Sequence, residues 1–97
     1  MTDEERAALI ALARAAPRDA PRLYKRVNGR KTIDPNPVHH YMYVAQDGSW
    51  WITYGGGVTL AVVNSLRAKG LIEPRWSDDP RARDLAFNIS DAGRAAL

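Results

Sequence analysis

The sequence predicts a single α+β domain, and three observations support this prediction. The chain has 97 residues, of which 45% are hydrophobic and 26% charged, so it can build one modest core. Two segments with helical periodicity enclose a stretch rich in proline, aromatic and β-branched residues. An alternating hairpin pattern and a short capped helix follow. We therefore expect one domain over residues 1–97.

Residues 1–17 are predicted to form the first helix. Thr2 and Glu5 have the spacing of a capping box, and acidic residues fill the first turn, where the helix dipole favours negative charge. Apolar residues recur at positions 9, 12, 13 and 16 and form one stripe along the helix. Pro17 is expected to end the helix.

Residues 18–57 are predicted to form a strand-rich insert, because their prolines exclude a long helix. The Asn-Gly pair at 28–29 and the Asp-Gly pair at 47–48 are typical of hairpin turns. Residues 50–54 are aromatic and β-branched, which favours a strand. The three glycines at 55–57 are predicted to form a flexible turn that leads into the next helix.

The second helix is predicted over residues 58–70. Val62, Val63 and Leu66 lie on one face of it, and Gly70 occupies the position where a glycine often follows a helix. Opposite this stripe, on the exposed face, we expect Leu60 and the small or polar residues Ala61, Asn64, Ser65 and Ala68.

A hairpin over residues 71–90 and a short helix over residues 91–97, capped by Ser90, complete the chain. The middle of the hairpin is a polar loop. Its second strand is expected to direct three alternate side chains into the core, namely Leu85, Phe87 and Ile89.

The last forty residues resemble the winged helix-turn-helix superfamily. A helix ends in L-R-A-K-G-L-I-E at 66–73, D-D-P-R-A-R follows at 78–83, and the segment closes with F-N-I-S-D-A-G-R at 87–94. This order is similar to the recognition helix and wing of MarR-type bacterial regulators. The overall layout, with strands where a helix would stand, is similar to the small YjhX-like toxin family. The resemblance implies a winged-helix-like domain with an N-terminal helix, a β-hairpin-rich insert, a recognition-type helix, a wing and a short C-terminal helix.

The resemblance also implies double-stranded DNA as the leading partner and transcriptional regulation in a bacterium or phage as the function. Residues 58–69 would enter the major groove, and cations of the wing and of the insert would hold phosphates. The net charge of +3 permits such a partner. The long dimerisation helices of MarR-type regulators have no counterpart, so the oligomeric state, including a homodimer, stays open. The candidate DNA-binding residues are Thr59, Asn64, Ser65, Arg67, Lys69, Arg75, Arg81, Arg83, Arg26, Arg30 and Lys31.

The alternative is a protein-interaction module on the same fold, such as a phage inhibitor or toxin-like protein that binds a host or regulatory protein. An exposed aromatic side chain can anchor a protein interface or stack on an unpaired base. Neighbouring residues of a strand face opposite sides, so one of two adjacent tryptophans belongs to the core, and the sequence leaves open which one. The candidate interface residues are Tyr41, Tyr43, Trp50, Trp51 and Tyr54.

Other function classes have little support in the sequence. His39 and His40 would point to opposite faces of a strand, so we expect no metal site. The glycines at 55–57 lack the ending of a phosphate-binding loop, and no nucleophile has a base at a telling spacing, so we expect neither a cofactor nor catalysis. There is no cysteine, no long apolar run and no basic N-terminal segment, which together predict a cytoplasmic protein without a membrane span.

Overall fold

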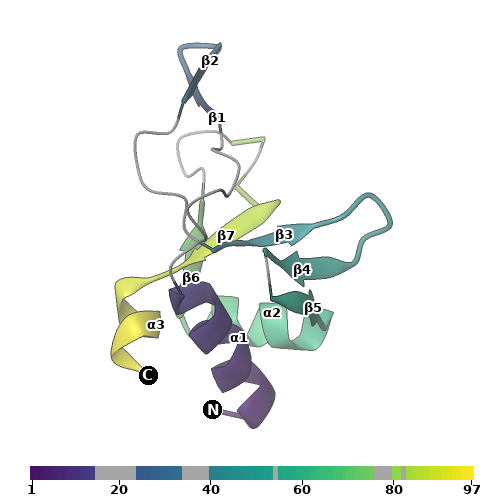
Figure 1. The fold of residues 1–97 in the computed structure, drawn as a ribbon, viewed down its shortest axis with the longest axis vertical. Helices are drawn as coiled ribbons and strands as arrows, with labels where there is room; N and C mark the ends of the chain where they lie inside the picture. Colours follow the sequence, from purple (N-terminus) through teal and green to yellow (C-terminus); the bar gives the residue numbers. More distant parts are fainter. Residues whose placement is uncertain (15–23, 34–39, 54, 76–79, 82) are drawn as a thin grey trace.

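The computed structural model of the 97-residue chain describes residues 1–14, 24–33, 40–53, 55–75, 80–81 and 83–97. It confirms an α+β domain in which three helices accompany a five-stranded antiparallel sheet (Figure 1). In chain order the elements are α1 (Asp3–Ala13), β1 (Tyr24–Val27), β2 (Arg30–Ile33), β3 (Met42–Val44), β4 (Trp50–Ile52), β5 (Gly56–Val58), α2 (Leu60–Ala68), β6 (Ile72–Pro74), β7 (Ala86–Ile89) and α3 (Asp91–Ala95). No helix in these ranges is long and apolar enough to cross a membrane.

The five strands lie in the order β5-β4-β3-β7-β6, and every neighbouring pair is antiparallel. The hairpin β6–β7 therefore joins the insert through β3, which pairs with β7 from Met42 opposite Phe87. The hairpin β1–β2 is a separate two-stranded sheet that projects away from α1 and α2 (Figure 1). Both chain termini lie at the helical end of the molecule.

The core lies between one face of the sheet and the helices. Alternate residues of the strands enter it because side chains of a strand point to opposite faces in turn. α1 contributes Ala8, Leu9 and Leu12, and α2 contributes Val62, Val63 and Leu66. From the sheet the buried side chains are Met42, Trp50, Ile52, Ile72, Phe87 and Ile89.

α1 begins as the sequence predicts but ends earlier. The Thr2 hydroxyl accepts a hydrogen bond from the Glu5 amide at 3.2 Å, as expected of an N-cap. The helix ends at Ala13 because the backbone of Arg14 is extended, with ψ at 148°. The predicted end at Pro17 is therefore wrong, and residues 15–17 lie outside the described part of the chain.

The predicted turns at residues 28–29 and 47–48 are confirmed, whereas the predicted turn at residues 55–57 is not. Asn28 and Gly29 join β1 to β2 with φ angles of 51° and 77°, the left-handed values of a two-residue hairpin turn. Gly48 turns the β3–β4 hairpin with φ at 86°. Gly56 and Gly57 form strand β5 with Val58, so the prediction of a mere turn at residues 55–57 is wrong. Pairing with β4 explains the strand despite the low β-propensity of glycine.

α2 ends in a Schellman motif that leads the chain directly into β6. The Gly70 amide donates to the Arg67 carbonyl and the Leu71 amide donates to the Leu66 carbonyl, both at 3.0 Å. Gly70 has φ at 70°, which only glycine adopts at low cost. The predicted role of Gly70 is therefore confirmed.

The start of α3 is held against this junction. The Ser90 hydroxyl accepts from the Gly93 amide and donates to the Gly70 carbonyl at 2.6 Å. A Cβ on Gly93 would lie 2.2 Å from the Leu71 carbonyl oxygen, so only glycine fits this position. The S-x-x-G pattern thus reflects close packing. Leu85, directly before β7, is 50% exposed, so its predicted place in the core is wrong.

Candidate functional site

The exposed face of α2 carries few charged groups. Ala61, Asn64 and Ala68 are exposed, and Leu60 at the N-terminus is 59% exposed. Thr59 caps the helix, because its hydroxyl accepts from the Val62 amide at 3.4 Å. Because the side chains beside the Asn64 amide group are small, another molecule can approach this surface of the helix closely.

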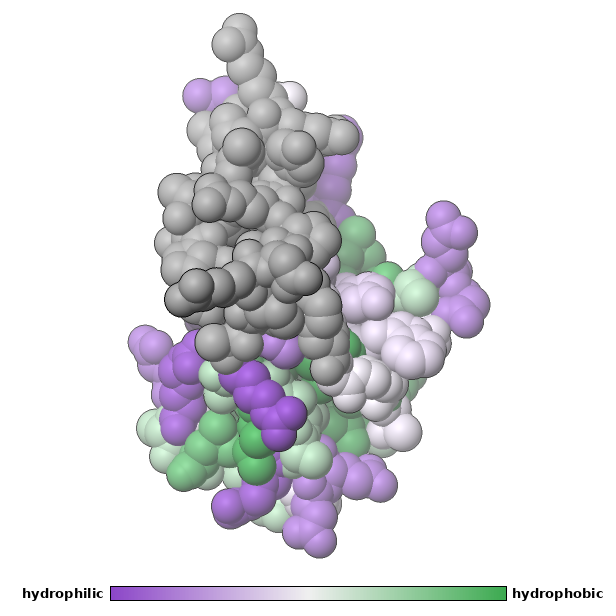
Figure 2. Space-filling view, viewed as in Figure 1, coloured by the Kyte–Doolittle hydropathy of each residue, from purple (hydrophilic) through white to green (hydrophobic). Residues whose placement is uncertain are grey.

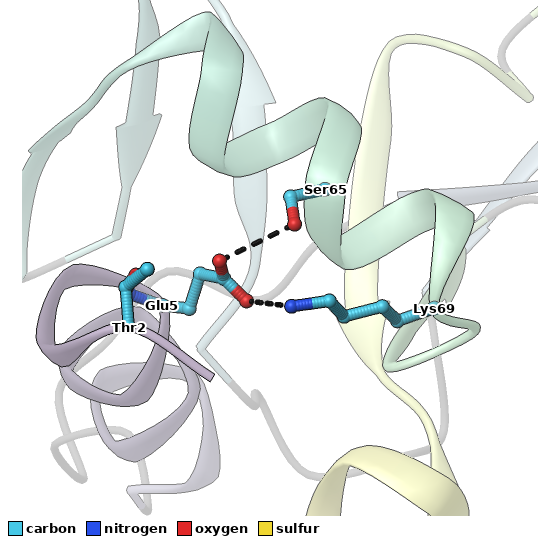
Figure 3. A network of polar contacts seen from close by, with 4 residues as sticks. All are labelled: Thr2, Glu5, Ser65 and Lys69. Carbon is cyan, nitrogen blue, oxygen red and sulfur yellow. Dashed lines mark hydrogen bonds and ion pairs between the residues drawn. The ribbon is translucent and has the colours of Figure 1, made fainter.

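Two predicted DNA-binding residues, Ser65 of α2 and its C-cap Lys69, contact α1 instead (Figure 3). The Ser65 hydroxyl donates to Glu5 Oε1 at 3.3 Å, and Lys69 Nζ donates to Glu5 Oε2 at 2.7 Å. The Glu5 side chain is only 7% exposed. Ser65 is half-buried on the α1 side of the helix, so its predicted place on the exposed face is wrong.

The hydrogen bond from Lys69 is the main cause that lowers the pKa of Glu5 below its ordinary value of 4.5. The charge of Lys69 and the hydroxyls of Ser65 and Thr2 act in the same direction, and burial opposes them. Glu5 was predicted only as a capping residue. Its partners follow 60 and 64 positions later, and no local pattern in the sequence indicates such a contact.

Arg67 lies on the other flank of α2, toward β7. Its guanidinium donates to Asp84 Oδ1 at 2.9 Å and lies 4.9 Å from the centre of the Phe87 ring. Both charged side chains are accessible, with 43% of Arg67 and 76% of Asp84 exposed. An ion pair this exposed contributes little to stability, so Asp84 can yield Arg67 to another anion.

The remaining wing arginines differ in their surroundings. Arg75 is half-buried, donates to Asn88 Oδ1 at 2.8 Å and lies 4.6 Å over the Tyr41 ring. Arg81 and Arg83 are exposed in the connection between β6 and β7. Arg81 and Arg83 therefore reach solvent beside the hairpin, whereas Arg75 belongs to the sheet surface.

The predicted cations of the insert fall on the hairpin β1–β2. Arg26 lies in β1, and Arg30 and Lys31 lie in β2. Arg26 and Lys31 are paired residues of the β1–β2 ladder. Three cations are thus grouped on one projecting element.

Trp50 and Trp51 have opposite environments, and the structure answers which one is exposed. Trp50 is 8% exposed and packs on Phe87, with ring centres 5.6 Å apart. Trp51 is 43% exposed on the outer face of the sheet, directly opposite Tyr43 in the ladder. Trp50 is therefore a core residue, and its predicted place in an interface is wrong.

The outer face of the sheet carries an aromatic row that the alternative function requires. Tyr43 and Tyr41 are half-buried, with ring centres 5.7 Å apart. Side chains of near-neutral hydropathy gather over β3, β4 and β5, next to the hydrophilic tip of the β3–β4 hairpin (Figure 2). Tyr54, the last aromatic candidate, lies outside the described residues.

The indole of Trp51 is held in place from the hairpin tip. Its Nε1 donates to the Ser49 hydroxyl at 2.8 Å, and Ser49 donates to Asp47 Oδ1 at 2.5 Å. Hydrogen bonds from the Ser49 hydroxyl and amide lower the pKa of Asp47 below its usual value. These hydrogen bonds hold the exposed ring against the hairpin tip.

No protein-family model, no curated protein and no solved structure matches the chain. The structure is that of a small α+β domain in which a capped helix leads through a tight junction into an antiparallel hairpin. Among the described residues, no group of three His, Cys, Asp or Glu side chains is placed to hold a metal ion.

Proposed function

We propose that the protein is a small winged-helix-like DNA-binding protein that acts in transcriptional control. α2 is the recognition helix, β6–β7 is the wing, and double-stranded DNA is the partner. The observation that carries the proposal is the exposed, small-residue face of α2, together with the exposed Arg81 and Arg83 of the hairpin connection. The order of α2, β6 and β7 along the chain corresponds to the order of recognition helix and wing that the resemblance implies.

Each contact has a defined role in this proposal. Asn64 faces the bases, because an amide side chain bonds adenine with two hydrogen bonds in the major groove. Arg67 exchanges Asp84 for a phosphate beside the helix, and Arg81 and Arg83 hold the flanking backbone. Ser65 and Lys69 stay bonded to Glu5 and support the helix from behind.

The test is a fluorescence anisotropy titration with a labelled duplex of random sequence at about 50 and about 200 mM salt. Wild-type protein is compared with the double variant Arg81→Ala/Arg83→Ala and with the control Arg94→Ala, which removes an exposed arginine from α3. We expect the double variant to lower the slope of log affinity against log salt by about 2, since each phosphate contact adds roughly 0.9. Equal slopes for all three proteins would remove the wing from the proposal.

A second function is favoured by one observation, the exposed and fixed indole of Trp51. In this alternative the domain binds a host or regulatory protein through the aromatic row of Trp51, Tyr43 and Tyr41. Trp51→Ala would then abolish partner binding while the fold, followed by circular dichroism, stays intact. Trp51→Ala protein with normal binding would reject this function.

A further inference from the structure

An open cavity of about 330 Å³ lies where α1, α2 and the edge strand β5 meet. Its volume is at the low end of the range for ligand pockets, which suits one large side chain. Glu4 is the only charged residue among the described ones that line it. The others are small or apolar and include Ala7 of α1, Val62 of α2 and the β5 residues Gly57 and Val58.

Strand β5, which borders this cavity, is the edge strand of the sheet, and some of its backbone groups point away from β4. The Thr53 amide donates to the Tyr41 carbonyl, and the Ala45 amide donates to the Ser49 carbonyl. Hydrogen-bonded pairs alternate along an antiparallel strand, so Trp51 also directs its backbone groups toward β3. Gly57 stands opposite Trp51 in β5, and its N–H and C=O therefore point to the open edge. Gly57 and its two preceding glycines are exposed.

The other face of the same edge is covered by an aromatic ring. Carbon Cζ3 of Trp51 lies 3.7 Å from the position that a Cβ on Gly57 would occupy. The indole thus flanks β5 on the outer face, while the cavity flanks it on the core face. One exposed strand edge is bordered by an apolar feature on each side.

We propose that the β5 edge binds an extended peptide segment of a partner protein by strand addition. The peptide pairs with Gly57, and its residue opposite Gly57 packs on the Trp51 indole, because paired residues share a face. The next residue of the peptide points to the other face and places a large apolar side chain in the cavity. A Lys or Arg two positions further along the peptide reaches the carboxylate of Glu4. This site extends the second candidate function and is independent of DNA binding.

The chemistry of the edge excludes a second copy of this chain as the occupant. A copy that paired through its own β5 would offer Gly56 and Val58 on the core face, and Val58 is half-buried in its own domain. Neither residue supplies a large side chain for the cavity. The carboxylate of Glu4 beside the cavity also favours a cationic side chain in the bound segment, and strand β5 contains none.

The test selects binders from random linear peptides displayed on phage, with the wild-type domain as bait. Synthetic copies of the selected peptides are then titrated by fluorescence anisotropy against three variants. Ala7→Leu fills the cavity, and Gly57→Pro removes the outward N–H at an edge position where proline is tolerated. Ala61→Leu is the matched control, because it adds the same side chain to an exposed helical alanine outside the cavity.

We expect the selected peptides to share a large apolar residue with a Lys or Arg two positions away. Ala7→Leu and Gly57→Pro should each weaken binding at least about tenfold, and Ala61→Leu should leave it within about twofold. Amide resonances of Gly55 and Gly57 should shift on titration. Circular dichroism confirms the fold of each variant, and Ala7→Leu alone decides the matter if Gly57→Pro does not fold.

The proposal is overturned if the selection returns no binder, or if the selected peptides bind Ala7→Leu as tightly as wild type. The duplex titration keeps the two proposals apart. Ala7→Leu should retain DNA affinity, and Ala61→Leu should lose it, because a leucine at position 61 crowds the face of α2 that approaches the groove. Each proposal can therefore fail alone.

Discussion

The two flanks of α2 each hold one cation from the end of the helix, and they hold it in opposite ways. On the α1 flank, Lys69 is bonded to Glu5, a carboxylate with a side chain only 7% exposed. On the wing flank, Arg67 is bonded to Asp84, which is 76% exposed. We call the α1 flank closed, because the carboxylate that binds its cation is buried, and the wing flank open, because its carboxylate is exposed.

This difference decides which cation another molecule can recruit. If a phosphate drew Lys69 away, the Glu5 carboxylate would remain buried without its counter-ion, which is a costly state. Asp84 would simply return to water when Arg67 left it. Position in the sequence does not distinguish the two side chains, since both stand in or beside the last turn of one helix. Their partners distinguish them.

The largest effect is expected from the apolar contact that holds the closed flank. Leu9 is fully buried on α1, so Leu9→Ala should lower the free energy of unfolding by about 2–5 kcal/mol. Leu85→Ala on the open side should change it by less than about 0.5 kcal/mol, because Leu85 is half exposed. Urea unfolding followed by circular dichroism measures both. Equal losses would mean that the two flanks are packed alike.

The framework of the fold could be predicted because its signals are local. The caps at Thr2 and Ser90, the turn at Asn28 and the glycine at position 70 each act within a few residues of themselves. Strand β5 could not be predicted, because its glycines become a strand only through pairing with β4. The end of α1 could not be predicted either, since no local feature of the sequence marks Ala13 as its last residue.

Lys69→Met is the next largest change, because it removes the ammonium and keeps an apolar stem. Glu5 is then left with only the hydroxyls of Ser65 and Thr2, so the melting temperature should fall further than in Arg67→Met. The double variant Glu5→Gln/Lys69→Met removes both charges and should recover part of the loss. A Lys69→Met protein as stable as Arg67→Met would show that the closed flank is not held by this contact.

The loss in Lys69→Met should depend on pH. In the folded protein the pKa of Glu5 lies below its ordinary value of 4.5, chiefly because Lys69 donates to it. The unfolded chain therefore binds a proton first as pH falls, and the stabilisation is fully present above 4.5 and lost as pH drops through the folded pKa. The difference in unfolding free energy between wild type and Lys69→Met should shrink between about pH 7 and about pH 3. A constant difference would contradict the ionic contact.

The candidate site was only partly predictable from the sequence. The apolar stripe of Val62 and Leu66 orients α2, but it does not say which polar residues turn toward α1. Ser65 was assigned to the exposed face for that reason. The sequence also does not show which of Trp50 and Trp51 is buried. Alternation places them on opposite faces of the strand, and only tertiary packing decides which face is covered.

The smallest effect on stability is expected on the open flank, and it carries the sharpest information. Arg67→Met should change the unfolding free energy by no more than about 1 kcal/mol, the scale of an exposed ion pair and a cation–π contact. The same variant should lower the salt slope of DNA binding by about 1, because one phosphate contact is lost. Lys69→Met, measured at a temperature where it is folded, should keep the wild-type slope. If the slopes are reversed, so that Lys69 contributes and Arg67 does not, then DNA breaks the buried contact and α1 must move when the helix binds.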